Sequence, residues 1–212
     1  MVKFFIPLMV MQLSFTFSQE LPGLDPNKKN DIPLYFQKGL LKGSATITPG
    51  RMLQNKANSI YLSGFLEYVI NENYSFRGDV FQFMDAVYSF ESLIEPSFQN
   101  RLYFGAFRHF GKSNLKFYIG LQMGTTVTTY NHGWFSGNRT QVDPSFSIKT
   151  GVNYYVWKYF HFFADINYVN STLRGTSFGS QRMDEILFSA GLGFQIQTRK
   201  KVKNYQTITP SF

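Results

Sequence analysis

One feature of this sequence limits its fold more than any other: apolar and polar residues alternate, and the alternation recurs along most of the chain. Residues 115–123 show it most clearly. Their odd-numbered positions are Leu115, Phe117, Ile119, Leu121 and Met123, and their even-numbered positions are Lys116, Tyr118, Gly120 and Gln122. Successive side chains of a β-strand point to opposite faces, so this segment predicts a strand with one apolar and one mostly polar face.

Eight segments carry this alternation, and each approaches the ~10 residues that a tilted strand needs to cross a bilayer. The weakest is the first, over residues 41–47, and the last, over residues 186–196, is among the most regular. The segments begin at Leu41, Ile60, Tyr74, Arg101, Leu115, Phe146, Phe160 and Ile186.

The connections between the segments alternate between short and long. The short links are 71–73, 111–114 and 156–159, and the long links are about 49–57, 82–98, 126–142 and 170–183. Outer-membrane barrels have short periplasmic turns and longer external loops. With an even number of strands and both termini in the periplasm, the first link must be external, and it is one of the long ones.

Aromatic residues lie near the ends of several segments or in the turns, where the interfacial girdles of membrane barrels lie. They are Tyr74, Tyr154, Trp157, Tyr159, Phe160 and Tyr168. A soluble β-sandwich also alternates, but it needs neither this placement nor regular loop lengths. The sequence therefore predicts an all-β fold, an eight-stranded antiparallel transmembrane up-and-down β-barrel over residues 38–199.

The composition agrees with a barrel whose two faces differ. Aromatic residues make up 18% of the chain and charged residues 16%, below the usual figure of about 25%. The mean hydropathy is nevertheless only −0.18, because lipid-facing and lumen-facing residues average out. The chain contains no Cys, which excludes disulfides and thiol chemistry.

The first 18 residues have the pattern of a secretory signal peptide. Lys3 precedes an apolar run that is too short to span a bilayer, and Thr16 and Ser18 occupy the positions where signal peptidase requires small side chains. The alternative is a buried N-terminal helix of a soluble protein. We expect residues 1–18 to be removed, 19–37 to form a periplasmic lead, and 200–212 to form a basic periplasmic tail.

The alternation within the segments and the regular succession of long and short links together resemble those of the small outer-membrane β-barrel proteins of the OmpA-transmembrane type, particularly the compact versions common in Bacteroidota. The resemblance covers Lys38 to Arg199 and includes no invariant motif, so it implies an architecture rather than a subfamily. It implies a location in the outer membrane of a Gram-negative bacterium. A subunit of a secretion, insertion or uptake machine is one role that it makes plausible.

The polar faces of the segments predict an ionic network inside the barrel. Buried charges are costly unless they are paired, so we expect these groups to pair, with Glu67 and Arg77 as the natural partners. Eight strands enclose a space that side chains fill, which favours a plug over a narrow pore or proton path. The predicted lumen network is Lys42, Glu67, Arg77, Asp79, Arg101, Lys116, Lys149, His161 and Asp165.

The sequence gives little support for catalysis. A Ser nucleophile must lie within hydrogen-bond reach of its base, which on one strand requires His-x-Ser spacing, and none of His109, His132 or His161 has it. Cross-strand pairs, such as His161 with a Ser of a neighbouring strand, remain open. No spacing of His, Asp or Glu predicts a metal site, and no Gly-rich phosphate loop is present, so no cofactor is expected.

The predicted external loops are rich in aromatic residues. Such residues suggest contact with a partner or with outer-leaflet lipid, and the alternative is that the loops fold over the barrel mouth. Part of the second loop, from Met84 to Leu93, loosely fits a short amphipathic helix. The candidate contact residues are Phe83, Tyr88, Phe90, Tyr130, Trp134 and Phe135.

The net charge is +8, and part of the excess lies in a basic tail after the last segment. This tail could meet anionic lipid headgroups or acidic periplasmic partners, or simply be solvated and help to fix orientation. Nucleic acid is not an expected partner of an exported barrel. The tail residues are Arg199, Lys200, Lys201 and Lys203.

These observations favour a non-enzymatic outer-membrane barrel with a plugged lumen, acting as a structural or accessory subunit of a larger assembly. The expected partners are outer-membrane lipid, lipopolysaccharide and other outer-membrane proteins. A narrow-pore transporter of small or hydrophobic solutes is the main alternative, and a lipid A-modifying enzyme is a weaker one.

Overall fold

The computed structural model describes residues 35–88, 96–111, 113–131, 138–176 and 179–199. The predicted signal peptide, most of the lead and the tail after Arg199 lie outside these residues. Within them the chain forms β-strands and no helix. The strands are β1 (Leu40–Met52), β2 (Asn58–Val69), β3 (Tyr74–Val87), β4 (Pro96–Phe110), β5 (Leu115–Asn131), β6 (Asn138–Tyr155), β7 (Phe160–Thr176), β8 (Gly179–Arg182) and β9 (Glu185–Gln197).

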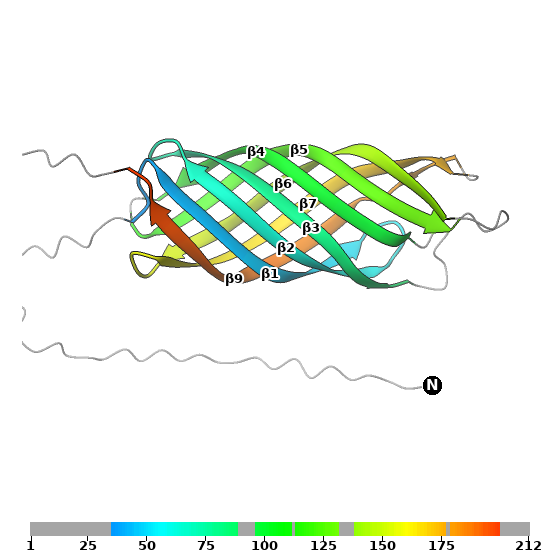
Figure 1. The fold of residues 1–212 in the computed structure, drawn as a ribbon, viewed down its shortest axis with the longest axis horizontal. Helices are drawn as coiled ribbons and strands as arrows, with labels where there is room; N and C mark the ends of the chain where they lie inside the picture. Colours follow the sequence, from blue (N-terminus) through cyan, green and yellow to red (C-terminus); the bar gives the residue numbers. More distant parts are fainter. Residues whose placement is uncertain (1–34, 89–95, 112, 132–137, 177–178, 200–212) are drawn as a thin grey trace, which may run out of the picture. The chain divides into compact units, whose positions relative to one another are not determined.

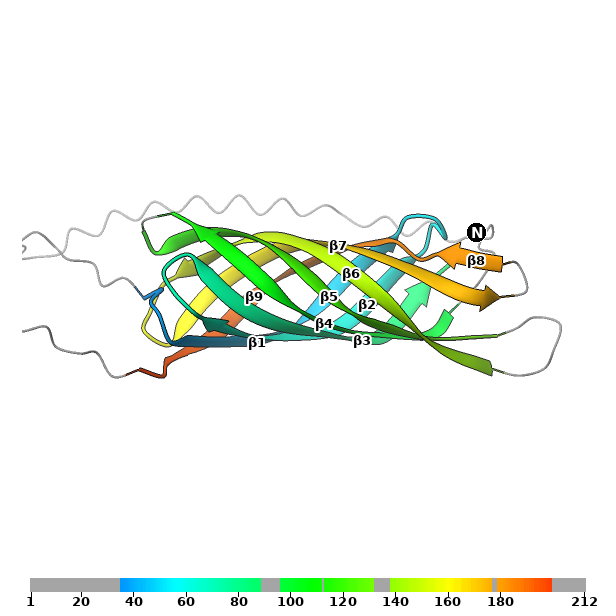
Figure 2. The same cartoon turned by 90° about the horizontal axis from the view of Figure 1, so that it is seen from above.

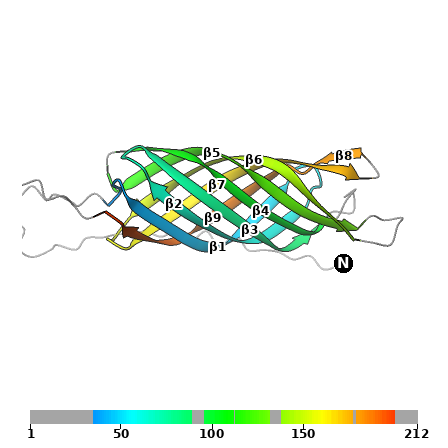
Figure 3. The same ribbon diagram turned by 45° about the horizontal axis from the view of Figure 1, so that its top comes forward.

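Eight of these strands close into an antiparallel barrel, as the alternation predicts. Each of β1 to β7 pairs with the next in sequence, β9 pairs with β7, and β1 pairs with β9 to close the ring. Figures 1 and 3 show the strands tilted around a common axis. The remaining strand, β8, pairs with the end of β7 and forms a short hairpin beyond the ring, visible in Figure 2.

The two ends of the barrel differ, and we name them by their connections. The turn end carries the short links β2–β3, β4–β5 and β6–β7, together with the start of β1 and the end of β9 (Figure 1, left). The loop end carries the longer links. In the β2–β3 turn, Asn71 Oδ1 accepts hydrogen bonds from the backbone N–H of Asn73 and Tyr74, at 2.9 Å each, which fixes the tight connection.

The strands extend further at the loop end than the sequence predicts. Residues 126–131 and 138–142, expected in a loop, continue β5 and β6, and residues 82–87 continue β3. The helix expected from Met84 is therefore wrong at least as far as Val87. The reason is that the apolar row ends while backbone pairing continues: β5 runs on through Thr125, Thr126, Thr128 and Thr129, which suit a strand but are not apolar.

Side chains on the two faces of the barrel have opposite character. Outward positions such as Leu66, Phe104, Leu121 and Phe162 are large, apolar and exposed, as a lipid-facing surface requires. Inward positions are buried and include the charged residues described below. None of the described residues belongs to a helix long and apolar enough to cross a membrane.

Candidate functional site

Among the described residues, three groups of buried ionic side chains lie along the length of the lumen. The group nearest the turn end contains Lys42, Glu67 and His109. Lys42 Nζ lies 2.9 Å from Glu67 Oε1 and donates a hydrogen bond to the Tyr155 hydroxyl at 3.0 Å. His109 Nε2 lies 3.1 Å from the same Glu67 oxygen.

The expected Glu67–Arg77 pair is not the main contact of either residue. Arg77 Nη1 is 4.0 Å from Glu67 Oε2, although the two residues are direct cross-strand neighbours. Glu67 is also directly opposite Lys42 on its other neighbour, β1, and its carboxylate lies nearer to that ammonium. The predicted up-and-down order gives both neighbours of β2, but only the tight β2–β3 turn also fixes a register, and the longer β1–β2 link does not.

The central group is built around Asp79. Arg77 Nη2 lies 2.8 Å from Asp79 Oδ1, and Lys149 Nζ lies 2.5 Å from the same oxygen. Gln122 Nε2 donates to Asp79 Oδ2 at 2.6 Å. Asp79 and Lys149 come from β3 and β6, which are not adjacent, so this ion pair crosses the lumen.

Arg77 also reaches the opposite wall. Its Nη2 lies 3.3 Å from Asp165 Oδ2 on β7, and the Tyr118 hydroxyl donates to that oxygen at 3.0 Å. The guanidinium carbon lies 3.7 Å from the centroid of the Phe65 ring, within the range of a cation–π contact. Phe65 packs edge-on against Phe163 at 5.3 Å, so aromatic rings fill the space beside the ion pairs.

The third group lies toward the loop end, where Arg101 of β4 forms an ion pair with Glu185 of β9 across the lumen. Arg101 Nη2 also donates to Gln99 Oε1 at 3.0 Å. Glu185 accepts hydrogen bonds from Ser59 and, at 2.9 Å, from the Tyr61 hydroxyl. Both charged side chains are fully buried.

These pairs leave the ion-paired set electrically neutral, with four cations and four carboxylates. The cations are Lys42, Arg77, Arg101 and Lys149, and the carboxylates are Glu67, Asp79, Asp165 and Glu185. Lys116 lies nearer the turn-end mouth, where its ammonium donates to the Gly111 carbonyl rather than to a carboxylate. Each of the eight ion-paired residues is at most 4% exposed, so pairing is required for stability.

A short segment before β1 covers the turn end of the lumen. The Phe36 ring is 4% exposed and lies 4.5 Å, between centroids, from the His109 ring. The ammonium groups of Lys42 and Lys116 lie 5.6 and 5.4 Å from the Phe36 centroid. Phe36 therefore closes this mouth beneath the first ionic group.

His161 is in the lumen but does not belong to the ionic network, contrary to the prediction. Its ring stacks on Tyr155 at 5.6 Å and lies 6.3 Å from both Phe65 and Phe163. Neither ring nitrogen has a hydrogen-bond partner among the described residues. The ring fits over Gly193, where a Cβ would meet it at 2.4 Å.

A Ser–His–carboxylate contact does form across strands, at His109 rather than His161. Ser75 Oγ lies 2.8 Å from His109 Nε2, the same nitrogen that faces Glu67. A catalytic triad uses one ring nitrogen for the nucleophile and the other for the acid, so this geometry does not form that relay. Phe36 also covers His109, and Ser75 is fully buried. The described residues contain no group of three or more His, Asp or Glu side chains that could hold a metal ion.

The described loop aromatics pack against the barrel, as the alternative of loops folded over the mouth predicts, and their contact with a partner stays a prediction. Phe83 lies in β3 with its ring 5.8 Å from that of Tyr61. The Tyr88 hydroxyl donates to the Pro96 carbonyl at 2.5 Å, and Tyr130 is only 1% exposed. The other candidates, Phe90, Trp134 and Phe135, lie outside the described residues.

The predicted basic tail lies mostly outside the described residues. Lys200, Lys201 and Lys203 are not described, whereas Arg199 packs beside Gly39 at the turn end.

Two members of the site were not included in the predicted ionic network, although the alternation includes both. Glu185 precedes the predicted last segment by one residue and shares the inward parity of Ser189. His109 continues the inward row of Arg101 and Tyr103 beyond the predicted fourth segment. Extending each segment by its parity would have identified them.

No protein-family model and no curated protein matches this sequence. Solved structures do. OprG from Pseudomonas aeruginosa has a TM-score of 0.57 and 13% identity, covering 78% of this chain and all of that one. Neisserial surface protein A has a TM-score of 0.55 and 16% identity over 74% of this chain and 96% of that one. Ail of Yersinia pestis has a TM-score of 0.51 and 15% identity over 76% of this chain and all of that one. These similarities show the fold, that of the small eight-stranded outer-membrane barrels.

Proposed function

We propose that this chain is a non-conducting barrel of the outer membrane that serves as a structural or accessory subunit of a larger secretion, insertion or uptake assembly. The observation that carries this proposal is the set of ion pairs that cross the lumen. Asp79–Lys149, Arg77–Asp165 and Arg101–Glu185 each join strands that are not neighbours in the ring. They occupy the path that a solute would need.

The energetics support a permanent plug. Removing one partner of a buried ion pair costs about 3–5 kcal/mol, so opening the lumen through several such pairs would be strongly unfavourable. Eight-stranded barrels also have an interior that side chains can fill completely. A barrel closed in this way acts through its ends and its outer surface.

The proposed orientation places the turn end in the periplasm, in line with short turns on that side of outer-membrane barrels. Because the chain has no Cys, single cysteines report on topology without background. Ser113, in the β4–β5 turn, and Ser180, in β8, are both exposed. On intact cells, a membrane-impermeant maleimide is expected to label Ser180→Cys and not Ser113→Cys. After lysis both variants should react equally, and the opposite pattern on intact cells would reverse the orientation.

The accessory role predicts a stoichiometric partner in the native membrane. The chain should be purified from its own outer membrane in mild detergent, with an unrelated small barrel purified in parallel as the control. We expect one or more outer-membrane proteins to co-purify at a fixed ratio with this chain and to be missing from the control. Recovery of the chain as a lone monomer under conditions that preserve other outer-membrane complexes would contradict the role.

One observation favours the alternative of a narrow pore. Asn153 and Asn167 are fully buried in the lumen, and neither amide has a hydrogen-bond partner among the described residues. Buried polar groups usually bind a protein group or ordered water, so these amides could line a thin polar path. The two roles differ in whether ions cross the barrel.

A further inference from the structure

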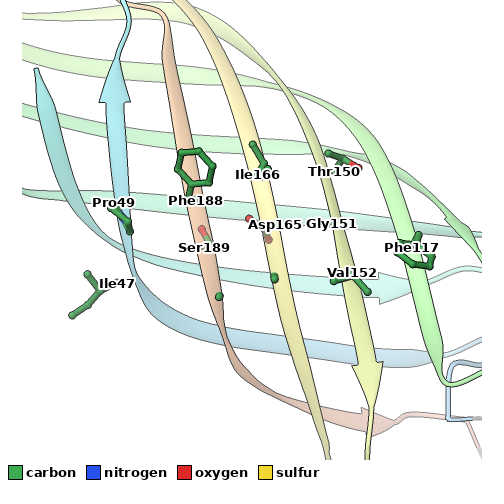
Figure 4. Close-up of a pocket in the computed structure, with 12 residues that line it drawn as sticks. Ile47, Pro49, Phe117, Thr150, Gly151, Val152, Asp165, Ile166, Phe188 and Ser189 are labelled. Atoms are coloured by element: carbon green, nitrogen blue, oxygen red, sulfur yellow. The ribbon is translucent and has the colours of Figure 1, made fainter. Parts of the chain in front are cut away.

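The outer face of the barrel carries a groove of about 650 Å³ over β1, β9, β7, β6 and the start of β5 (Figure 4). Its floor contains small side chains, among them Ala164 and Ala190. Larger apolar side chains border it, including Ile47, Phe117 and Phe188. Its volume lies within the roughly 300–1,000 Å³ of typical ligand sites.

The groove coincides with an interruption of the strand pairing that closes the barrel. Between β1 and β9, cross-strand pairs join 40–43 to 194–197 and 50–52 to 185–187, and none joins the described residues between them. Pro49 lies in this stretch and has no N–H to donate. The Thr46 hydroxyl instead donates to the Ala190 carbonyl at 2.8 Å. At the groove, therefore, β1 contains a Pro that cannot donate a backbone hydrogen bond and a Thr whose hydroxyl donates one to β9 instead.

The groove rises obliquely from the turn end toward the middle of the apolar band. A row of directly paired residues runs from Phe117 to Val152, Ala164 and Ala190. Phe117 lies two residues inside the turn-end start of β5, whereas Ala190 lies seven residues inside the turn-end limit of β9. The groove crosses four strand spacings, from β5 to β1, and is therefore about 19 Å long, at roughly 4.8 Å per spacing.

The lining determines what could occupy the groove. Its outward side chains are apolar apart from Thr150. Asp165 and Ser189 belong to the inward rows, and each is already bonded there, to Tyr118 and Thr48 respectively. The groove therefore offers no free charge to a polar ligand, and its surroundings in the membrane are hydrocarbon.

The end of the groove that is nearest the turn end of the barrel lies beside a turn suited to a lipid headgroup. The β6–β7 turn follows Tyr155 and carries Trp157, Lys158 and Tyr159, all exposed. Trp and Tyr favour the membrane interface, and Lys attracts lipid phosphate. An apolar groove that starts at a basic, aromatic turn and ends at mid-membrane matches the chemistry of a phospholipid.

We propose that this groove is a binding site for one phospholipid of the membrane leaflet at the turn end. An acyl chain would lie along Val152, Ala164 and Ala190, and the phosphate would lie near Lys158. A second copy of the chain fits poorly, because a two-fold interface would place one hollow against the other. The affinity of this site for the lipid depends on packing rather than on the hydrophobic effect, since a lipid chain is already in an apolar medium.

The test compares three proteins refolded into vesicles of phosphatidylethanolamine and phosphatidylglycerol. They are the wild type, Ala190→Phe, which fills the groove, and the control Ala106→Phe, an outward alanine of β4 outside the groove. Each is extracted in mild detergent, checked for heat-modifiable migration in gels, and examined by native mass spectrometry. If Ala190→Phe does not fold, Ala164→Phe takes its place.

The wild type and Ala106→Phe should each retain one phospholipid, and Ala190→Phe should retain about tenfold less, equivalent to about 1.4 kcal/mol. A fourth protein, Lys158→Glu with the groove intact, should lower retention of phosphatidylglycerol more than that of phosphatidylethanolamine. Equal retention by the wild type and Ala190→Phe, or no retained lipid on the wild type, would overturn the proposal. Neither result bears on whether the lumen conducts.

Discussion

Replacing Glu185 by leucine is expected to lower the free energy of unfolding by about 3–5 kcal/mol, because the substitution leaves Arg101 buried without its carboxylate. Glu185 also accepts hydrogen bonds from Ser59 and Tyr61, and all four side chains are buried. Urea unfolding of the refolded barrel, followed by tryptophan fluorescence, measures the change.

Two control variants separate the buried pair from a general effect of charge. In Glu185→Leu combined with Arg101→Met, both charges are gone, and most of the lost stability should return. Arg182→Ala removes the ion pair with Asp184, in which the Arg182 side chain is 57% exposed, and should cost no more than about 1 kcal/mol. A loss for Glu185→Leu no larger than that for Arg182→Ala would contradict the view that this lumen pair is essential.

Substituting Gly105 by alanine is expected to destabilise the barrel by about 3 kcal/mol or more, at or above the usual range for overpacking. A Cβ at this position would lie 2.0 Å from the Leu121 carbonyl oxygen and 2.6 Å from Gln122 Cα. Both are backbone atoms of β5, so a rotamer change cannot relieve the clash, and the β4–β5 pairing would have to open. The fraction of protein with heat-modifiable migration and the urea midpoint both report the effect.

Gly64→Ala is the matched control for Gly105→Ala. It also adds one methyl group to a strand glycine, but its Cβ would be 3.1 Å from the nearest atom, the Ser44 carbonyl oxygen. We expect this variant to fold with little change in stability. Equal behaviour of the two alanine variants would mean that close packing at Gly105 is not a constraint on the barrel.

The arrangement of the strands could be predicted from the sequence because membrane-spanning strands must alternate. The inward assignments of Arg77, Asp79 and Lys149 follow directly from the parity of their segments. The extensions of β3, β5 and β6 could not be found by the same rule, since strands that leave the membrane keep their pairing but lose their apolar row.

The partners inside the lumen were less predictable than its composition. Alternation shows that a residue points inward, but it contains no information about which strand lies across the barrel. Arg101 and Glu185 are far apart in sequence and lie on strands that are not neighbours. His161 shows the opposite case: it has the parity of the ionic residues, yet aromatic rings surround it.

The most direct test of a closed lumen is single-channel recording from the purified barrel in a planar bilayer. The wild type, with insertion confirmed by heat-modifiable migration and by protease protection, is expected to show no stable openings. A 16-stranded porin, whose barrel leaves an aqueous channel, is recorded in the same bilayer as the positive control. Stable, reproducible openings of the wild type would contradict the plug and favour the narrow pore.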